Sequence, residues 1–264
     1  MLLIAALTSE QSLLTIFLAA GILLLLWFSA KHIDKRPFSE YGFWFSAGWI
    51  RDFVAGNIIA ATGMAFIVGL NVWMGWIVIT DYRFTFTNFD FVYGLLGILA
   101  VMTAVSLWEE AYFRSYLILN IKESVPDKWV GKRGSVAAAV LFSSVFFGLV
   151  HLGNPNSSWI STMNISIAGL VFAYPYIITK SIAIPIGMHL SWNYFQGAVF
   201  GLPVSGTHFD QVMMGVDVTG PEVFTGGNFG PEAGVAGLLG FVVLLGLTEF
   251  YIILFYKNKS AESL

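Results

Sequence analysis

The sequence is dominated by apolar runs of roughly 20 residues, the length that an α-helix needs to cross a bilayer. The first run, residues 13–28, contains no charged side chain at all. Only 11% of the 264 residues are charged, whereas a soluble domain carries about 25%. So few charges cannot cover a water-exposed surface. The chain is therefore predicted to be an all-α, polytopic bundle of transmembrane helices.

Seven spans are expected, separated by short polar turns. They cover residues 13–28, 53–79, 91–119, 136–152, 160–179, 182–200 and 235–256. Residues 1–90 would hold the first two spans and an aromatic-rich interfacial helix at 38–52. Residues 91–264 would form the core, with a long, glycine-rich outer loop at 201–234 before the last span.

The basic residues sort to one side of this arrangement, as the positive-inside rule requires of a correct set of spans. Arg83 alone falls on the other side, and Arg114 lies within a span. The remaining basic residues are Lys31, Lys35, Arg36, Arg51, Lys122, Lys128, Lys132, Arg133, Lys180, Lys257 and Lys259. We therefore predict a multi-pass protein of the cell membrane, with its N-terminus outside and its C-terminus in the cytoplasm.

Three charged side chains interrupt the third span. Glu109, Glu110 and Arg114 follow a run of uncharged residues, and each charge at the bilayer centre costs on the order of 3 kcal/mol. Glu110 and Arg114 are four residues apart with the acid first, the favourable order for an ion pair on one helix face. Glu109 lies about 100° around the helix from Glu110. Arg114 is thus predicted to neutralise Glu110 as structural support, leaving Glu109 free for acid–base chemistry.

Polar residues on two other spans are candidate partners of Glu109. His189 and Asn193 share one helix face, and so do Phe147 and His151, because each pair is four residues apart. A single histidine in a span is usually an interhelical hydrogen-bond partner. Here, however, two histidines, an amide and a free carboxylate lie on three spans of one small bundle. His32 and His208 fall in loops and are expected to be solvated.

This set of side chains suits hydrolysis. Glu109 can take a proton from water, His151 can orient that water, and His189 with Asn193 can stabilise a developing oxyanion. Alternatively, Glu109, His151 and His189 can bind zinc with water in the open position. The residue spacing does not decide between these two schemes. The chain contains no cysteine and no G-x-S-x-G motif to indicate an acyl-enzyme.

The three motifs together resemble the CAAX protease and bacteriocin-processing family of intramembrane proteases, also called the abortive-infection family. Its pattern is E-E-x-x-x-R, then F-x-x-x-H, then H-x-x-x-N, which this chain has at residues 109–114, 147–151 and 189–193. Segments 151–155, 200–206 and 226–232 also resemble bacterial members.

The resemblance implies an endopeptidase that cleaves a membrane-associated protein or peptide, with Glu109 activating water and His151, His189 and Asn193 assisting. The family is commonly labelled metalloprotease, and a mechanism without bound zinc has also been argued for it. Its eukaryotic members remove the last three residues of prenylated CAAX proteins.

Two hypotheses for the function other than a protease remain. Members of this family also act as non-catalytic bacteriocin-immunity or scaffold proteins. Intramembrane carboxylates and histidines can also build a proton or transport pathway. The partners expected in each case are the bilayer and, for the protease, a membrane peptide. Nothing in the sequence resembles a nucleic-acid-binding module.

The expected depths of the candidate residues in the membrane are not consistent with a single shared site. Counted at about 1.5 Å per residue, Glu109 and His189 lie roughly 12–15 Å from the inner face, but His151 lies about 22 Å from it. Helix tilt, a deep polar cavity or a later start of the fourth span would have to bring them together.

Overall fold

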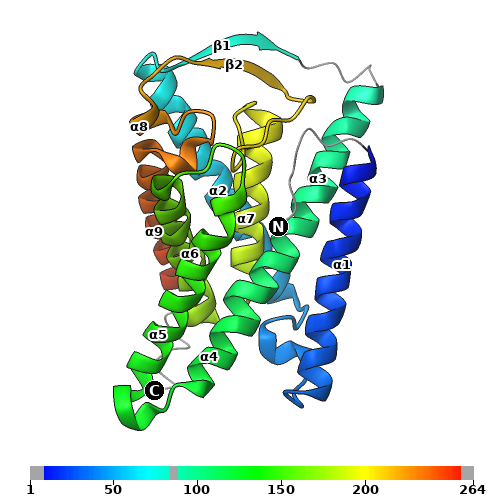
Figure 1. Cartoon of the computed structure of the whole chain (residues 1–264), viewed down its shortest axis with the longest axis vertical. Coiled ribbons are helices and arrows are strands. Elements are labelled where there is room, and N and C mark those ends of the chain that lie inside the picture. The colour runs from blue at the N-terminus through cyan, green and yellow to red at the C-terminus, as the bar shows by residue number, and fades with distance from the viewer. Residues whose placement is uncertain (1–8, 84–88, 257–264) are drawn as a thin grey trace.

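The structure is a computed structural model that describes residues 9–83 and 89–256. It confirms the predicted all-α polytopic bundle (Figure 1). Six helical segments of the described residues are long and apolar enough to cross a membrane. They are α1 (Ser9–His32), α2 (Ala47–Trp73), the continuous segment from α3 (Phe89–Glu109) through the π-helical η2 (Glu110–Leu117) to α4 (Ile118–Ser124), α5 (Asp127–Val150), α6 (Trp159–Thr179) and α9 (Val235–Phe255).

The span predicted at 182–200 is a shorter, enclosed helix. It consists of α7 (Ala183–Tyr194), continued by the π-helical η4 (Phe195–Val199). Every residue from Ala183 to Trp192 is buried. Because α7 is surrounded by other parts of the protein, it needs neither the length nor the lipid-facing surface of an ordinary span. It therefore forms the centre of the bundle and carries two of the candidate site residues.

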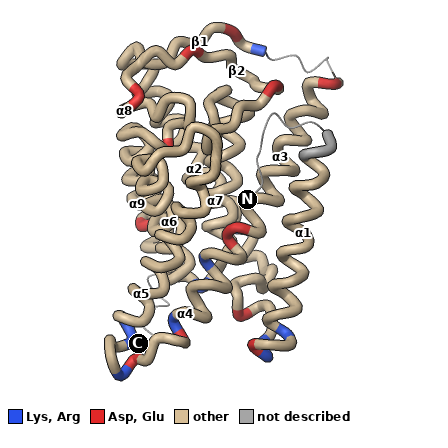
Figure 2. The backbone as a smooth tube through the Cα atoms, viewed as in Figure 1, with Lys and Arg blue, Asp and Glu red and all other residues tan. Residues whose placement is uncertain are grey.

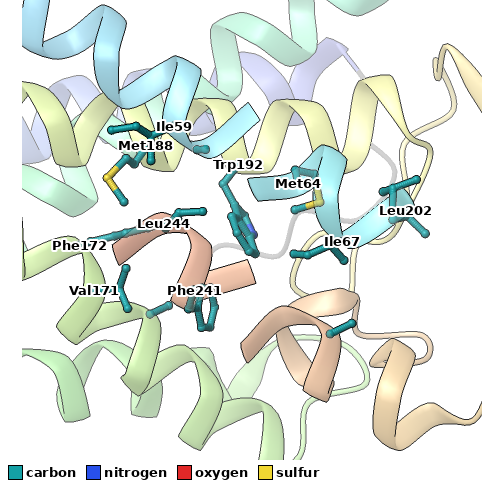
Figure 3. Packing of buried hydrophobic residues seen from close by; sticks show 14 of the residues in the cluster. Ile59, Met64, Ile67, Val171, Phe172, Met188, Trp192, Leu202, Phe241 and Leu244 are labelled. Carbon is teal, nitrogen blue, oxygen red and sulfur yellow. The ribbon is translucent and has the colours of Figure 1, made fainter. Parts of the chain in front are cut away.

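The hydrophobic core packs α2, α6 and α9 around α7. Figure 3 shows Trp192 of α7 beside Met64 and Ile67 of α2, with Phe241 and Leu244 of α9 across from them. All five side chains are at least nine-tenths buried. This packing fixes α7 between its neighbours, and with it the position of His189.

Two glycines let α2 and α7 approach closely. A Cβ on Gly56 would lie 2.4 Å from the carbonyl oxygen of Ile184, and a Cβ on Gly187 would lie 2.3 Å from that of Phe53. Both contacts are to backbone atoms, which cannot move aside as a flexible side chain would. Small residues at such crossings are typical of helix packing in membranes.

Replacing Gly56 with alanine should therefore destabilise the protein by about 1–3 kcal/mol, the usual cost of overpacking. Gly69→Ala is the matched control on the same helix, because a Cβ there would meet nothing within 4 Å. It should be neutral or slightly stabilising, since alanine is the better helix former. Thermal unfolding in detergent measures both, and equal melting temperatures for the two variants would contradict the close approach.

The prediction of an interfacial helix at residues 38–52 is wrong. The chain forms a single 3-10 turn, η1 (Phe38–Tyr41), and α2 already begins at Ala47, where the Ser46 hydroxyl accepts a hydrogen bond from the Trp49 amide at 3.2 Å. The aromatic side chains are not spread over a membrane surface. Tyr41 and Trp49 are buried among the helices, and the Trp49 indole donates to the Gly42 carbonyl at 2.9 Å.

The connections at the other end of the bundle contain more structure than predicted. The second span ends at Trp73, and β1 (Ile77–Tyr82) pairs antiparallel with β2 (Met214–Val218). The β-branched run Ile77–Thr80 explains why this segment is a strand. Residues 201–234, predicted as an irregular loop, include β2, the short α8 (Glu222–Thr225) and the 3-10 turn η5 (Pro231–Ala233).

The charged residues divide between the two ends of the bundle. Figure 2 shows mostly acidic positions near the β1–β2 sheet and clusters with basic residues near the junction of α4 and α5. This distribution agrees with the predicted positive-inside arrangement, which places the basic end in the cytoplasm.

Cysteine labelling tests that orientation directly, because the chain has no native cysteine. Ser124, at the end of α4, and Asp210, just before β2, are both exposed. Ser124→Cys should react with a membrane-impermeant thiol reagent only after the cells are opened, whereas Asp210→Cys should react in intact cells. Labelling of both cysteines from one side would contradict the predicted arrangement.

Candidate active site

The centre of the site is the junction of α3 and η2. Glu109 is the last residue of α3, and Glu110 is the first residue of the wider π-helical turns of η2. Single π-helical segments inside α-helices occur frequently at functional sites. The helix then continues through α4, so both glutamates lie far inside a span of 36 residues.

Glu110 and Arg114 form the ion pair predicted from their spacing. The Arg114 Nε lies 3.2 Å from Glu110 Oε2, and both side chains are fully buried. The guanidinium carbon also lies 4.0 Å from the centre of the Phe147 ring, a cation–π contact. Arg114 therefore joins the helix of the two glutamates to α5, in keeping with the supporting role expected of it and of Phe147.

His189 connects the two glutamates. Its Nδ1 lies 2.8 Å from Glu110 Oε1, and its Nε2 lies 3.9 Å from Glu109 Oε2. Because an ionised Glu110 can only accept, Nδ1 carries the proton of this hydrogen bond. Glu110 thus orients the His189 ring and turns Nε2 toward Glu109, a role that the helix spacing alone does not indicate. Such a partner fixes the tautomer of a functional histidine.

His151 and Glu109 line one cavity and lie on two antiparallel helices that are joined by a hydrogen bond. The Ser143 hydroxyl of α5 donates to the Phe113 carbonyl of η2 at 2.5 Å, which sets Ser143 level with Phe113. His151 follows Ser143 by eight residues and Glu109 precedes Phe113 by four, so His151 lies about 6 Å farther along than Glu109. This helix register therefore leaves a depth difference of about one turn between Glu109 and His151, and the cavity that both side chains line spans it.

The orientation of His151 is set by its own helix. Its Nδ1 lies 2.7 Å from the carbonyl oxygen of Phe147, so Nδ1–H is the donor and Nε2 is left as an acceptor. The Phe147 ring contacts the rings of both histidines edge-on, with centroids 4.7 Å from His151 and 6.2 Å from His189. Phe147 therefore contacts both histidines and also the Arg114 guanidinium.

A cavity of about 600 Å³ contains all four candidate catalytic residues. Glu109, His151, His189 and Asn193 line it together with mostly apolar side chains of α1, α3, η2, α5, α6, α7 and α9. Its remaining wall comes from loops near the β1–β2 sheet, at Asn154–Pro155, Val204–Thr207 and Glu232. A largely apolar cavity with a few convergent polar groups is the usual form of a binding site.

The Glu109 carboxylate is poised for chemistry inside this cavity. Only 12% of its side chain is exposed, and its Oε2 is buried without a hydrogen-bond partner among the described residues. The 3.9 Å to His189 Nε2 is too long for a hydrogen bond. Glu109 Oε2 and His189 Nε2 are close enough, however, for a single water molecule to form a hydrogen bond of about 2.8 Å to each of them. The arrangement can therefore hold and deprotonate water.

The donors do not form a metal-ligating set in this geometry. Zinc requires its nitrogen and oxygen ligands at about 2.0–2.2 Å. In the described part of the chain, no three His, Asp or Glu side chains come together closely enough for that. Glu109, His151 and His189, the predicted zinc ligands, share a cavity but do not converge on one point.

The loop residues of the cavity were not among the predicted site residues. Glu232 is the most notable, since it is a second buried carboxylate in the cavity wall. Its segment, 226–232, resembles the bacterial members of the family, but neither spacing nor hydrophobic pattern places it beside the motifs 40 to 120 residues earlier. His208 and His32 are exposed, as expected, and lie outside the cavity.

The comparison with known families agrees with the motifs. Residues 91–195 match the family model described as type II CAAX prenyl endopeptidase Rce1-like. The match covers all three motifs and confirms the resemblance inferred from them. No curated protein and no solved structure matches the chain. At the level of the family, the chain is therefore similar to a membrane-embedded protease that acts on protein substrates.

Proposed function

From the family match over residues 91–195, we propose that the protein is an intramembrane endopeptidase that hydrolyses a peptide bond of a membrane-associated protein or peptide. The observation that carries this proposal is Glu109 Oε2, which has no hydrogen-bond partner among the described residues and faces His189 Nε2 across 3.9 Å in a cavity large enough for a peptide segment. A purely structural carboxylate in an apolar span would be paired, as Glu110 is.

In the proposed mechanism, Glu109 acts as the general base. A water molecule donates one hydrogen bond to Glu109 and one to His189 Nε2, so its lone pairs point at the substrate carbonyl carbon. As the water oxygen attacks, its proton passes to Glu109. The proton then moves to the amine nitrogen while the C–N bond breaks, which releases a carboxyl and an amino terminus.

The other residues assist at defined positions. The side-chain amide of Asn193, one turn beyond His189, donates to the oxyanion that forms on the carbonyl oxygen. His151 Nε2 is an acceptor and holds the N–H of the departing amine. Glu110, neutralised by Arg114, keeps His189 in the tautomer that this geometry needs.

Asn193→Ala is expected to lower kcat by about 10²–10³-fold, the usual effect of removing an oxyanion donor. KM should change little, because the bond strengthens only in the transition state. Steady-state cleavage of a fluorogenic membrane peptide measures both constants. A rise in KM at constant kcat would assign Asn193 to substrate binding instead.

The test of the function itself is proteolysis by the purified protein in detergent or nanodiscs, with and without a chelator. We expect cleavage that persists in chelator, because the mechanism uses side chains that do not converge as metal ligands. Loss of activity that zinc restores would replace this mechanism with the zinc alternative. If no peptide is cleaved, and Glu109→Ala leaves a cellular phenotype unchanged, the scaffold or immunity function stands instead.

A further inference from the structure

Among the described residues, the cavity lining contains carboxylates and histidines but no Lys or Arg. Within the described part of the chain, its titratable lining consists of Glu109, Glu232, His151, His189 and Tyr112, and no Lys or Arg contributes to it. Arg114 is fully buried, in contact with the Phe147 ring and paired with Glu110. A negatively charged substrate group would therefore find no counter-ion in the cavity.

Glu232 is held in the cavity wall by hydrogen bonds. Its Oε1 accepts from the Ser205 amide at 2.5 Å, and its Oε2 accepts from the Gln196 side chain at 2.5 Å. Only 5% of the residue is exposed, and this burial raises the pKa of Glu232 to about 7. Whether ionised or protonated, the group brings no positive charge, and when ionised it adds a second negative charge to that of Glu109.

The end of the bundle nearest the loop wall is also acidic. Besides Glu232, the described residues at this end include five acids and a single basic residue, Arg83, which lies 2.8 Å from Asp81 in an ion pair. The acids are Asp81, Asp90, Asp210, Asp217 and Glu222. Figure 2 shows mostly acidic positions at this end of the bundle, opposite the basic clusters. The field there attracts cationic segments and repels anionic ones.

From the charge of the cavity and of this end, we propose that the site accepts peptide segments that are neutral or basic around the cleaved bond, and that it rejects a free C-terminal carboxylate close to that bond. This inference deepens the proposed function and rests on it. Like charges brought together in a poorly hydrated site repel each other, so the preference acts chiefly by exclusion. The substrate class thus differs from a short C-terminal peptide with a free carboxylate.

Matched fluorogenic peptides test this preference with the full chain in nanodiscs of phosphatidylcholine, which adds no net lipid charge. One peptide ends in a free carboxylate three residues after the candidate bond, and its partner ends in an amide. A second pair carries either two Lys or two Glu residues at those positions. We expect kcat/KM to be at least about tenfold higher for the amide and for the Lys peptide. Equal values, or a preference for the carboxylate or the Glu peptide, would overturn the inference.

Glu232→Gln tests the origin of the preference, with Glu40→Gln as the matched control. Glu40 is exposed in η1 and does not line the cavity. The first variant should reduce the discrimination several-fold by raising kcat/KM for the carboxylate peptide, and the control should leave it unchanged. If the ratio of kcat/KM between the two peptides were unchanged in Glu232→Gln, Glu232 would not cause the preference. The part of the inference that concerns the cavity wall would then be refuted.

Binding measurements with uncleavable peptides test this inference separately from the proposed function. The same peptides with N-methylated amide bonds resist hydrolysis, and fluorescence anisotropy gives their Kd for the wild-type protein. Tighter binding of the amide and Lys peptides without any cleavage of the parent peptides would support the charge preference and overturn the protease function. Cleavage combined with equal Kd and kcat/KM values for all peptides would support the protease function and overturn the charge preference.

Discussion

Glu109→Gln should abolish peptide hydrolysis while leaving the protein folded. The substitution keeps the size of the side chain and removes the base, so kcat is expected to fall by about 10²–10⁴-fold, the range of general acid–base catalysis. Stability should hold or rise, because Glu109 Oε2 is buried without a partner among the described residues, and a neutral amide costs less to bury than a charge. Turnover of a membrane peptide and thermal unfolding measure the two effects.

Glu249→Gln is the matched control for this experiment. Glu249 also lies within a span, on α9, where it accepts a hydrogen bond from the Tyr174 hydroxyl, and it does not line the cavity. Its replacement should leave kcat within about twofold of wild type, as expected for a group without contact to the reacting atoms. If Glu109→Gln retained wild-type turnover, or if both variants lost activity equally, the assignment of Glu109 as the base would be refuted.

Arg114→Met should cost about 3–5 kcal/mol of stability, the effect of leaving one member of a buried ion pair without its partner. Both side chains are fully buried, so no water can replace the guanidinium beside Glu110. The substitution also removes the cation–π contact with Phe147. Unfolding in detergent, followed by circular dichroism or by tryptophan fluorescence, gives the difference.

Arg51→Met shows what the same substitution costs at a less critical pair. Arg51 lies 3.0 Å from Asp52, but its side chain is 43% exposed, and Asp52 keeps the Tyr251 and Tyr256 hydroxyls as donors. The loss there should be no more than about 1 kcal/mol.

The double variant Glu110→Gln/Arg114→Met separates folding from catalysis. It should recover stability relative to Arg114→Met, because no charge is left unpaired, yet stay impaired in turnover, because His189 has lost its orienting carboxylate. A melting temperature of Arg114→Met equal to that of the wild type would contradict the role of the pair.

The spans and the local pairing of charges could be predicted because both depend on short-range patterns. Apolar runs of bilayer length identify helices whatever their neighbours are, and a four-residue spacing places Glu110 beside Arg114 on any helix. The motifs that contain His151, His189 and Asn193 were recognisable for a related reason. Each is a set of residues on one helix face, so its spacing is visible in the sequence.

Contacts between distant segments could not be predicted in the same way. The hydrogen bond from His189 to Glu110 depends on how α7 packs against α3, and the position of Glu232 depends on how its loop folds over the cavity. The pairing of β1 with β2 joins strands more than 130 residues apart. The aromatic residues around Trp49 suggested an interface because composition alone does not distinguish a lipid headgroup layer from a buried cluster.

The most direct test of water activation by Glu109 is a single-turnover reaction in H₂¹⁸O, with the products and the protein analysed by mass spectrometry. The wild-type protein is predicted to yield two fragments, one of them carrying a single ¹⁸O in its new C-terminal carboxylate, while Glu109 itself stays unlabelled and Glu109→Gln yields no fragments. Label in the Glu109 carboxylate instead of the product would show a covalent intermediate. The absence of fragments from the wild type would contradict the account altogether.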